Sequence, residues 1–158
     1  MIELKKTFEI LGFTEIKTLL NSGNVVFSTV EKDVEVLTDT IETKLEKEFT
    51  FKIPVMIRTS EEIQSLVVSD PFKQISITPE TRLYVTFLSE KPKSSLKIPY
   101  ESEKKDFGIL HVSDSEICNY LIPSAKRGSV DVMSFIEKEF GKNVTTRNWN
   151  TVLKIAAL

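Results

Sequence analysis

Asn21-Ser22-Gly23-Asn24-Val25-Val26-Phe27 predicts the tip and second strand of a tight β-hairpin. Apolar and β-branched residues lie on both sides of this polar turn, in strands expected at residues 15–20 and 24–29. Glycine takes positive φ angles without steric cost, and asparagine tolerates them better than most residues. The side chains of Asn21, Ser22 and Asn24 either face a ligand or bond to their own backbone within the turn.

The composition is that of a globular protein of one or two small domains. The 158 residues are 41% hydrophobic and 28% charged, with a net charge of −2. This charge gives no electrostatic footprint for nucleic acid, so we expect no such partner. The single cysteine, Cys118, excludes an intramolecular disulfide and suits a reducing compartment. No apolar run has the length of a membrane span and the N-terminus lacks a secretory signal, so we expect a cytoplasmic protein without a membrane segment.

Hydrophobic periodicity and capping signals predict the remaining helices and strands. Helices are expected at residues 2–11, 33–49, 60–69, 129–140 and 148–158. Further strands are expected at residues 53–58, 82–88, 106–112, 116–122 and 144–146, and a loop with one helical turn at 89–104. Thr59 and Glu62 have the spacing of a capping box at the start of the third helix.

The order of these elements is repeated along the chain. Residues 80–158 follow the split β-α-β-β-α-β order, with a variable connection in place of the first helix and one extra helix at the end. Residues 1–72 follow the same order without its opening strand. The sequence therefore predicts an α+β fold of two ferredoxin-like halves, residues 1–72 and 80–158, with a C-terminal helix.

Three stretches resemble a known family in their order and spacing. They are Leu11-Gly12-Phe13 with the hairpin sequence quoted above, Asp70-Pro71-Phe72 with residues 82–88, and Thr146-Arg147-Asn148-Trp149-Asn150-Thr151-Val152. Together they resemble a bacterial family known only as domain of unknown function number sixteen ninety-seven, across nearly the whole chain. The resemblance implies a cytoplasmic α+β protein of two ferredoxin-like halves with no established activity.

The resemblance also implies an N-terminal strand and a Gly-rich loop that this sequence lacks. Met1 falls where the first helix of the family begins. The absent strand would lie between residues 24–29 and 54–58, so we expect unpaired strand edges there and self-association through them. We also expect this form to be a truncation of a longer chain.

The densest polar and aromatic group is Arg147-Asn148-Trp149-Asn150, at a predicted strand-to-helix junction. The N–H groups and dipole of a helix start favour an anion, Arg147 would clamp it, and Trp149 would stack on a base or sugar. In the alternative, Asn148 caps the helix, Trp149 packs in the core and Arg147 pairs with a carboxylate. In either case we expect Trp149 to be at least half buried.

Lys126 and Arg127, before the penultimate helix, form either a second anion site or a solvated charged loop. Cys118 and His111 lie on the two strands of the second predicted hairpin, and a two-residue loop would set them opposite each other. Because no third group is placed to orient the histidine, we assign no catalytic residue. The sequence predicts no metal site and no cofactor, and it leaves open whether the protein is an enzyme.

Two functions fit these observations. The first is a small-molecule module that binds a small anionic or nucleotide-like ligand in a cleft between the halves, walled by residues 21–24 and 147–150. The second is a protein- or nucleic-acid-interaction domain without catalysis. Readers of RNA expose paired aromatic residues on one sheet face, whereas Tyr84 and Phe87 differ in parity and point to opposite faces. This difference argues against RNA.

Overall fold

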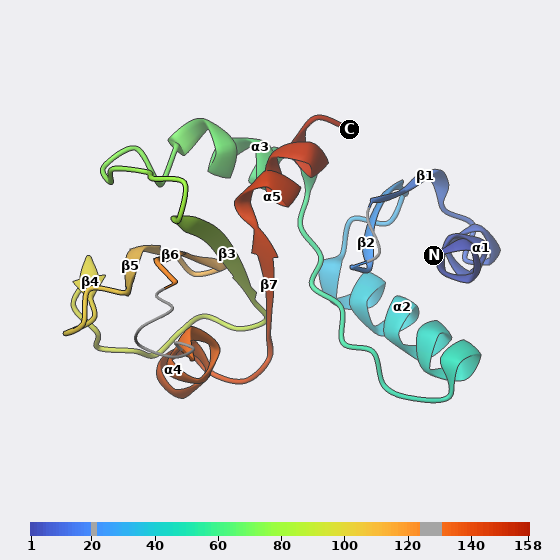
Figure 1. The fold of residues 1–158 in the computed structure, drawn as a ribbon. Helices are drawn as coiled ribbons and strands as arrows, with labels where there is room; N and C mark the ends of the chain where they lie inside the picture. The colour runs from blue at the N-terminus through green and yellow to red at the C-terminus, as the bar shows by residue number, and fades with distance from the viewer. Residues whose placement is uncertain (20–21, 124–130) are drawn as a thin grey trace. The chain divides into compact units, whose positions relative to one another are not determined.

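The computed structural model describes residues 1–19, 22–123 and 131–158. These residues form five helices and two antiparallel sheets, which confirms the α+β class. They divide into two compact units, residues 1–57 with Leu158 and residues 58–157 (Figure 1). We call these the first unit and the second unit. The expected division into domains at residues 1–72 and 80–158 stays a prediction.

The first unit packs two helices against one hairpin. Its elements are α1 (Ile2–Ile10), β1 (Thr14–Leu19), β2 (Asn24–Ser28) and α2 (Val34–Phe49). The rings of Phe8, Phe13 and Phe27 contact one another, with centroids 4.5 to 5.7 Å apart. With Ile41 and Leu45 of α2 they join the helices to one face of the hairpin. The two helices and the hairpin expected from the sequence are therefore confirmed.

The segment that follows α2 contains no strand, so the strand expected at residues 53–58 is wrong. Pro54 has no N–H group to donate to a neighbouring strand. The N–H of Val55 donates to Oε1 of Glu42 at 2.9 Å, a side chain of α2. Ile53 and Ile57 still pack against the core of the first unit. Within residues 1–19 and 22–57, β1 and β2 therefore form the whole sheet.

The second unit is a five-stranded antiparallel sheet between helices. Its elements are α3 (Ser60–Ser69), β3 (Arg82–Leu88), β4 (Tyr100–Glu101), β5 (Phe107–Val112), β6 (Glu116–Leu121), α4 (Val132–Phe140), β7 (Val144–Asn148) and α5 (Trp149–Ala156). The strand order is β4-β5-β6-β3-β7. Figure 1 shows α4 on one side of this sheet and α3 and α5 on the other. The helical turn expected within residues 89–104 is wrong, because the short strand β4 forms there and pairs with β5.

Both faces of the second sheet are buried. Ile117 of β6 packs with Val132 and Ile136 of α4 on one face. Successive residues of a strand point to opposite faces, so Cys118 and its partner on β3, Val85, point to the other face. Val85, Ile117 and Cys118 are all 0% exposed. Such full burial on both faces requires helices on both sides of the sheet.

The helix ends follow the signals in the sequence. Thr59 accepts from the N–H of Glu62 at 3.2 Å and its own N–H donates to the carboxylate of Glu62 at 2.7 Å, which is the predicted capping box. α3 ends at Asp70, which has φ 46° and precedes proline. Gly141 follows α4 with φ 103°. Among the described residues, no helix is both long and apolar enough to cross a membrane.

Candidate functional site

The junction of β7 and α5 holds the densest group of predicted site residues. Oδ1 of Asn148 accepts from the N–H of Asn150 at 2.9 Å, so Asn148 caps α5. Trp149 is 9% exposed, and its ring meets that of Phe72 edge-on with the centroids 5.1 Å apart. The prediction that Trp149 is at least half buried is confirmed. This packing favours a core role for the indole over stacking on a ligand.

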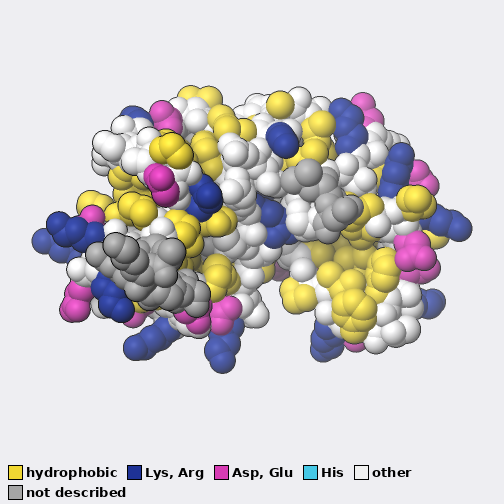
Figure 2. Space-filling model, in the orientation of Figure 1, with side chains coloured by type: hydrophobic (Ala, Val, Ile, Leu, Met, Phe, Trp, Pro, Cys, Tyr) yellow, Lys and Arg dark blue, Asp and Glu magenta, His cyan; other side chains and the backbone are white. Residues whose placement is uncertain are grey.

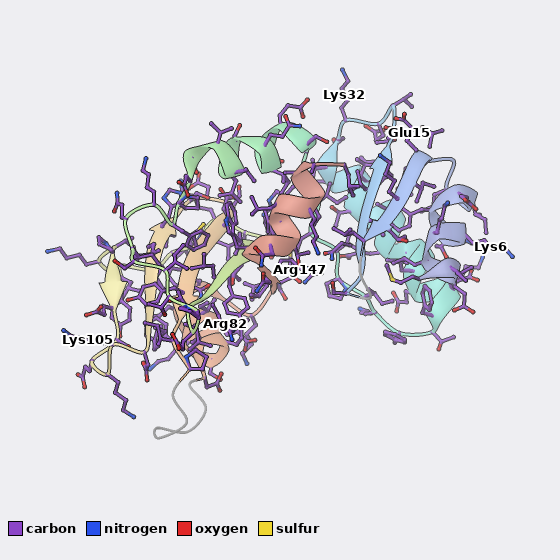
Figure 3. All side chains as sticks on the ribbon, turned by 45° about the horizontal axis from the view of Figure 1, so that its top comes forward. Lys6, Glu15, Lys32, Arg82, Lys105 and Arg147 are labelled. Carbon is purple, nitrogen blue, oxygen red and sulfur yellow. The ribbon has the colours of Figure 1, made fainter. Side chains whose placement is uncertain are left out.

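Arg147 is partly buried beside the start of α5 (Figure 3). Its Nη1 donates to Oγ1 of Thr145 at 2.8 Å and to the carbonyl oxygen of Thr146 at 2.9 Å. Burial lowers the pKa of Arg147 from its usual value, but a guanidinium remains charged at neutral pH. These contacts hold a cation against neutral oxygens of its own strand.

The hairpin tip shows the bonds expected of a turn. Nδ2 of Asn24 donates to the carbonyl oxygen of Leu19 at 3.2 Å and to Oγ of Ser22 at 2.9 Å. Asn24 is 8% exposed, and Gly23 has φ 73°. These contacts favour the turn interpretation for Ser22 and Asn24, because both side chains already stabilise the loop. Asn21 lies outside the described residues.

Two further expectations are not decided by these contacts. Lys126 and Arg127 lie outside the described residues. The cleft expected between residues 21–24 and 147–150 would combine residues of the first unit with residues of the second unit, and it stays a prediction.

His111 and Cys118 occupy opposite positions on β5 and β6, as a two-residue loop requires. Cys118 is fully buried, whereas His111 is exposed. Burial, with a smaller effect from the nearby carboxylate of Glu116, raises the pKa of the Cys118 thiol to about 12. A thiol with this pKa is protonated at neutral pH and is a poor nucleophile. Among the described residues, no group of three or more His, Cys, Asp or Glu side chains is placed to hold a metal ion.

Arg58 is a structural residue that the sequence did not indicate. Its Nη2 donates to the carbonyl oxygens of Leu88 and Ser115, both at 2.7 Å. Its guanidinium also lies 5.6 Å from the ring centroid of Phe87. These contacts fix the start of α3 to the ends of β3 and of the β5–β6 hairpin. In the sequence Arg58 follows an apolar run, as many surface arginines do. Its neighbours in the sequence therefore do not indicate that it has a structural role.

The first unit presents open apolar surface. Two shallow grooves of ≈ 510 and ≈ 460 Å³ meet at Phe13 and Thr14. The first groove runs between α1 and β1, and the second runs between the ends of the hairpin and Val36 of α2. Val30 and Phe51 are 98% and 60% exposed. Figure 2 shows hydrophobic side chains gathered on the surface of this unit.

These features describe an α+β protein to which we assign no catalytic residue. The family model described as "Protein of unknown function (DUF1697)" matches residues 1–117 of the 158. The chain belongs to this family, as the resemblance in its sequence indicated. No curated protein and no solved structure matches the chain.

Proposed function

We propose that the protein is a binding module without catalysis, and that its first unit binds a polypeptide. The observation that carries this proposal is the incomplete apolar layer of that unit. Among its described residues, the buried members of the core cluster are Phe8, Ile41 and Leu45, while ten further hydrophobic residues pack against them and stay partly exposed. Removing such surface from water is the main driving force of protein association.

The kind of partner follows from the sheet beside this layer. With two strands, each strand has a side that no other described strand pairs with. Backbone N–H and C=O groups on such an edge pair readily with another extended chain. Side chains at alternate positions of that chain would then meet the apolar layer. The proposed ligand is therefore an extended polypeptide with apolar residues at every second position.

We further propose that both units have a ferredoxin-like fold and that the protein is cytoplasmic. In the second unit β6 separates β3 from β5, and β3 separates β6 from β7, which supports a split β-α-β-β-α-β unit with a ferredoxin-like order. α1, the hairpin and α2 are the matching parts of the first unit. A cytoplasmic location accords with the single free thiol of Cys118.

The test is a selection of random dodecapeptides displayed on phage against the immobilised full chain. We expect enrichment of peptides with alternating apolar residues, and amide hydrogen exchange should then slow in the first unit when a selected peptide is added. Val68, on α3 of the second unit, is 84% exposed and supplies a control. Val68→Lys should bind the selected peptides as the wild type does. Absence of enrichment, or protection confined to the second unit, would contradict the proposal.

A second candidate is a small anionic or nucleotide-like ligand at Arg147, Asn148 and Asn150. The observation that favours it is the partly buried guanidinium of Arg147, which contacts neutral oxygens of Thr145 and Thr146. An arginine in this setting supports paired hydrogen bonds to a phosphate or carboxylate.

Thermal-shift measurements with nucleotides and phosphorylated metabolites test this candidate. We expect a ligand that raises the melting temperature of the wild type and not that of Arg147→Gln. Arg82 begins β3 and donates to the carbonyl oxygen of Pro79 at 2.8 Å, so Arg82→Gln is the matched control. Equal shifts in wild type and Arg147→Gln, or no shift with any ligand, would remove this candidate.

A further inference from the structure

The two strands of the first unit differ in how well their edges are protected. β1 carries the charged residues Glu15 and Lys17, and its register with β2 shifts between Thr14 and Lys17. Glu15 has φ 51°, in the left-handed region, and its carboxylate accepts from the hydroxyl of Ser28 at 2.6 Å. Figure 3 labels Glu15 on the hairpin. Charges and a bulge are the features that natural proteins use to block pairing at an edge.

β2 has none of these protective features. Its sequence, Asn-Val-Val-Phe-Ser, contains no charged residue and no proline. Its register with β1 is regular from Asn24 to Val26. Within residues 1–19 and 22–57, β1 is the only strand that pairs with β2. The outer edge of β2 is therefore the edge of this unit that is suited to pairing.

We propose that two copies of the chain associate through antiparallel pairing of β2 with β2 of the second copy. This inference rests on the polypeptide-binding function proposed above and names the partner. A two-fold axis at Val26 would place Val26 opposite itself, Val25 opposite Phe27 and Asn24 opposite Ser28 of the second copy. The two sheets would join as one sheet of four strands. A two-fold contact uses the same surface on both copies, so the assembly closes as a dimer.

The side chains of β2 are compatible with this register. Apolar β-branched and aromatic residues form favourable cross-strand pairs, and no like charges face each other. Val25 and Phe27 already pack against the core of the first unit, so pairing extends the apolar layer from one copy to the other.

Five paired residues cannot cover the roughly 1,600 Å² that a standard interface buries, so neighbouring side chains must take part. Val30 and Val36 are 98% and 49% exposed, and both line the groove at the end of β2. They are the apolar residues placed to complete the contact.

Sedimentation analysis over a range of concentrations tests the proposal with two substitutions at one site. We expect the wild type and Val26→Thr to dimerise, because threonine is also β-branched and neutral. Val26→Lys would place two like charges opposite each other, which is unfavourable, so we expect its dimer dissociation constant to rise roughly tenfold or more. Circular dichroism checks that each variant is folded.

A cross-linking measurement gives an independent readout if Val26→Lys fails to fold. With oxidised glutathione as the oxidant, two Val26→Cys thiols at the two-fold axis should form one intermolecular disulfide. Lys17→Cys is the matched control, because Lys17 pairs with Val26 but lies on β1. Cys118 is fully buried and adds no background.

The outcomes separate this inference from the proposed function. A monomeric wild type, a dimer unaffected by Val26→Lys, or equal cross-linking of the two cysteine variants would overturn the β2 dimer. Peptide binding to the first unit of a monomeric wild type would keep the proposed function while removing self-pairing. If neither peptides nor a second copy bind, both proposals fail.

Discussion

The two units differ most in how completely they enclose their apolar residues. In the second unit, Val85, Ile109, Ile117, Ile136 and Val152 are all 0% exposed. In the first unit, Ile41 and Leu45 are buried, but Val25 and Phe27 of the hairpin are not. Among the described strands, the inner strand β3 has a neighbour on each side, whereas β1 and β2 each have one.

This contrast shows that the sequence signals for turns and helix caps do not decide whether a hydrophobic core is fully enclosed. The turn at Gly23, the cap at Asp33 and the capping box at Thr59 form equally well in both units. They determine where helices and strands begin and end. Closure depends instead on how many strands lie side by side under the helices. In the part of the chain that the structure describes, the second unit has five strands and the first has two.

The largest expected effect is at Trp149. Trp149→Ala should lower the free energy of unfolding by about 3 to 5 kcal/mol, because enclosed neighbours such as Phe72 cannot collapse into the cavity. Phe8→Ala, its counterpart in the first unit, should fall at the lower end of that range, because Phe13 and Phe27 are partly exposed and can move. Urea unfolding followed by circular dichroism measures both. If Phe8→Ala lowers the free energy of unfolding more than Trp149→Ala does, the first unit encloses its aromatic residues more completely than the second.

A smaller effect is expected from adding one methyl group to a glycine in each unit. A Cβ at Gly108 would lie 2.5 Å from the ring of Tyr120 and 2.7 Å from the carbonyl oxygen of Tyr100. Overpacking of this kind costs about 1 to 3 kcal/mol. Because the carbonyl oxygen of Tyr100 belongs to the backbone and moves less easily than a side chain, we expect Gly108→Ala to cost close to the upper value. At Gly23 the space is open and φ is 73°, so Gly23→Ala should cost only about 1 kcal/mol of backbone strain. Equal costs in urea unfolding would show that the second unit is not the more tightly packed.

The smallest expected effect is the pH dependence that arises from Cys118. Its pKa is raised from 9.0 to about 12 in the folded protein, so folding favours the neutral thiol. The resulting stability is fully present below pH 9 and is lost as the pH rises toward 12. Between pH 9 and 10 the wild type should lose about 1 kcal/mol that Cys118→Ala does not lose. The free energy of unfolding is measured with urea at each pH. If it falls equally with pH in the wild type and in Cys118→Ala, water reaches the face of the sheet that carries Cys118.

The sequence predicted the elements whose signals are local. The capping box of α3 and the stop of α4 at Gly141 depend on residues a few positions apart. The strand expected at residues 53–58 is missing because a strand needs a neighbour, and the N–H of Val55 bonds to a helix side chain instead. β4 was missed for the converse reason: Tyr100 becomes a strand residue only by pairing with Ile109.

The candidate site was predictable to a similar extent. Capping by Asn148 and burial of Trp149 follow from residue type and position at a helix start, and the sequence supports both as alternatives to ligand binding. The contacts of Arg58 were not predictable, because they join it to residues 30 and 57 positions later in the chain. The unequal edges of β1 and β2 also depend on a backbone bulge at Glu15 that no residue pattern marks.

The strand order of the second unit has a consequence for its synthesis on the ribosome. Tyr84 of β3 pairs with Asn119 of β6 and with Asn148 of β7, which are translated 35 and 64 residues later. Because the chain emerges from its N-terminus, β3 leaves the ribosome before β6 and β7 do. During that interval an apolar strand has two unpaired edges, and chaperones that hold extended nascent chains would protect it. The sheet closes only once Asn148 has emerged.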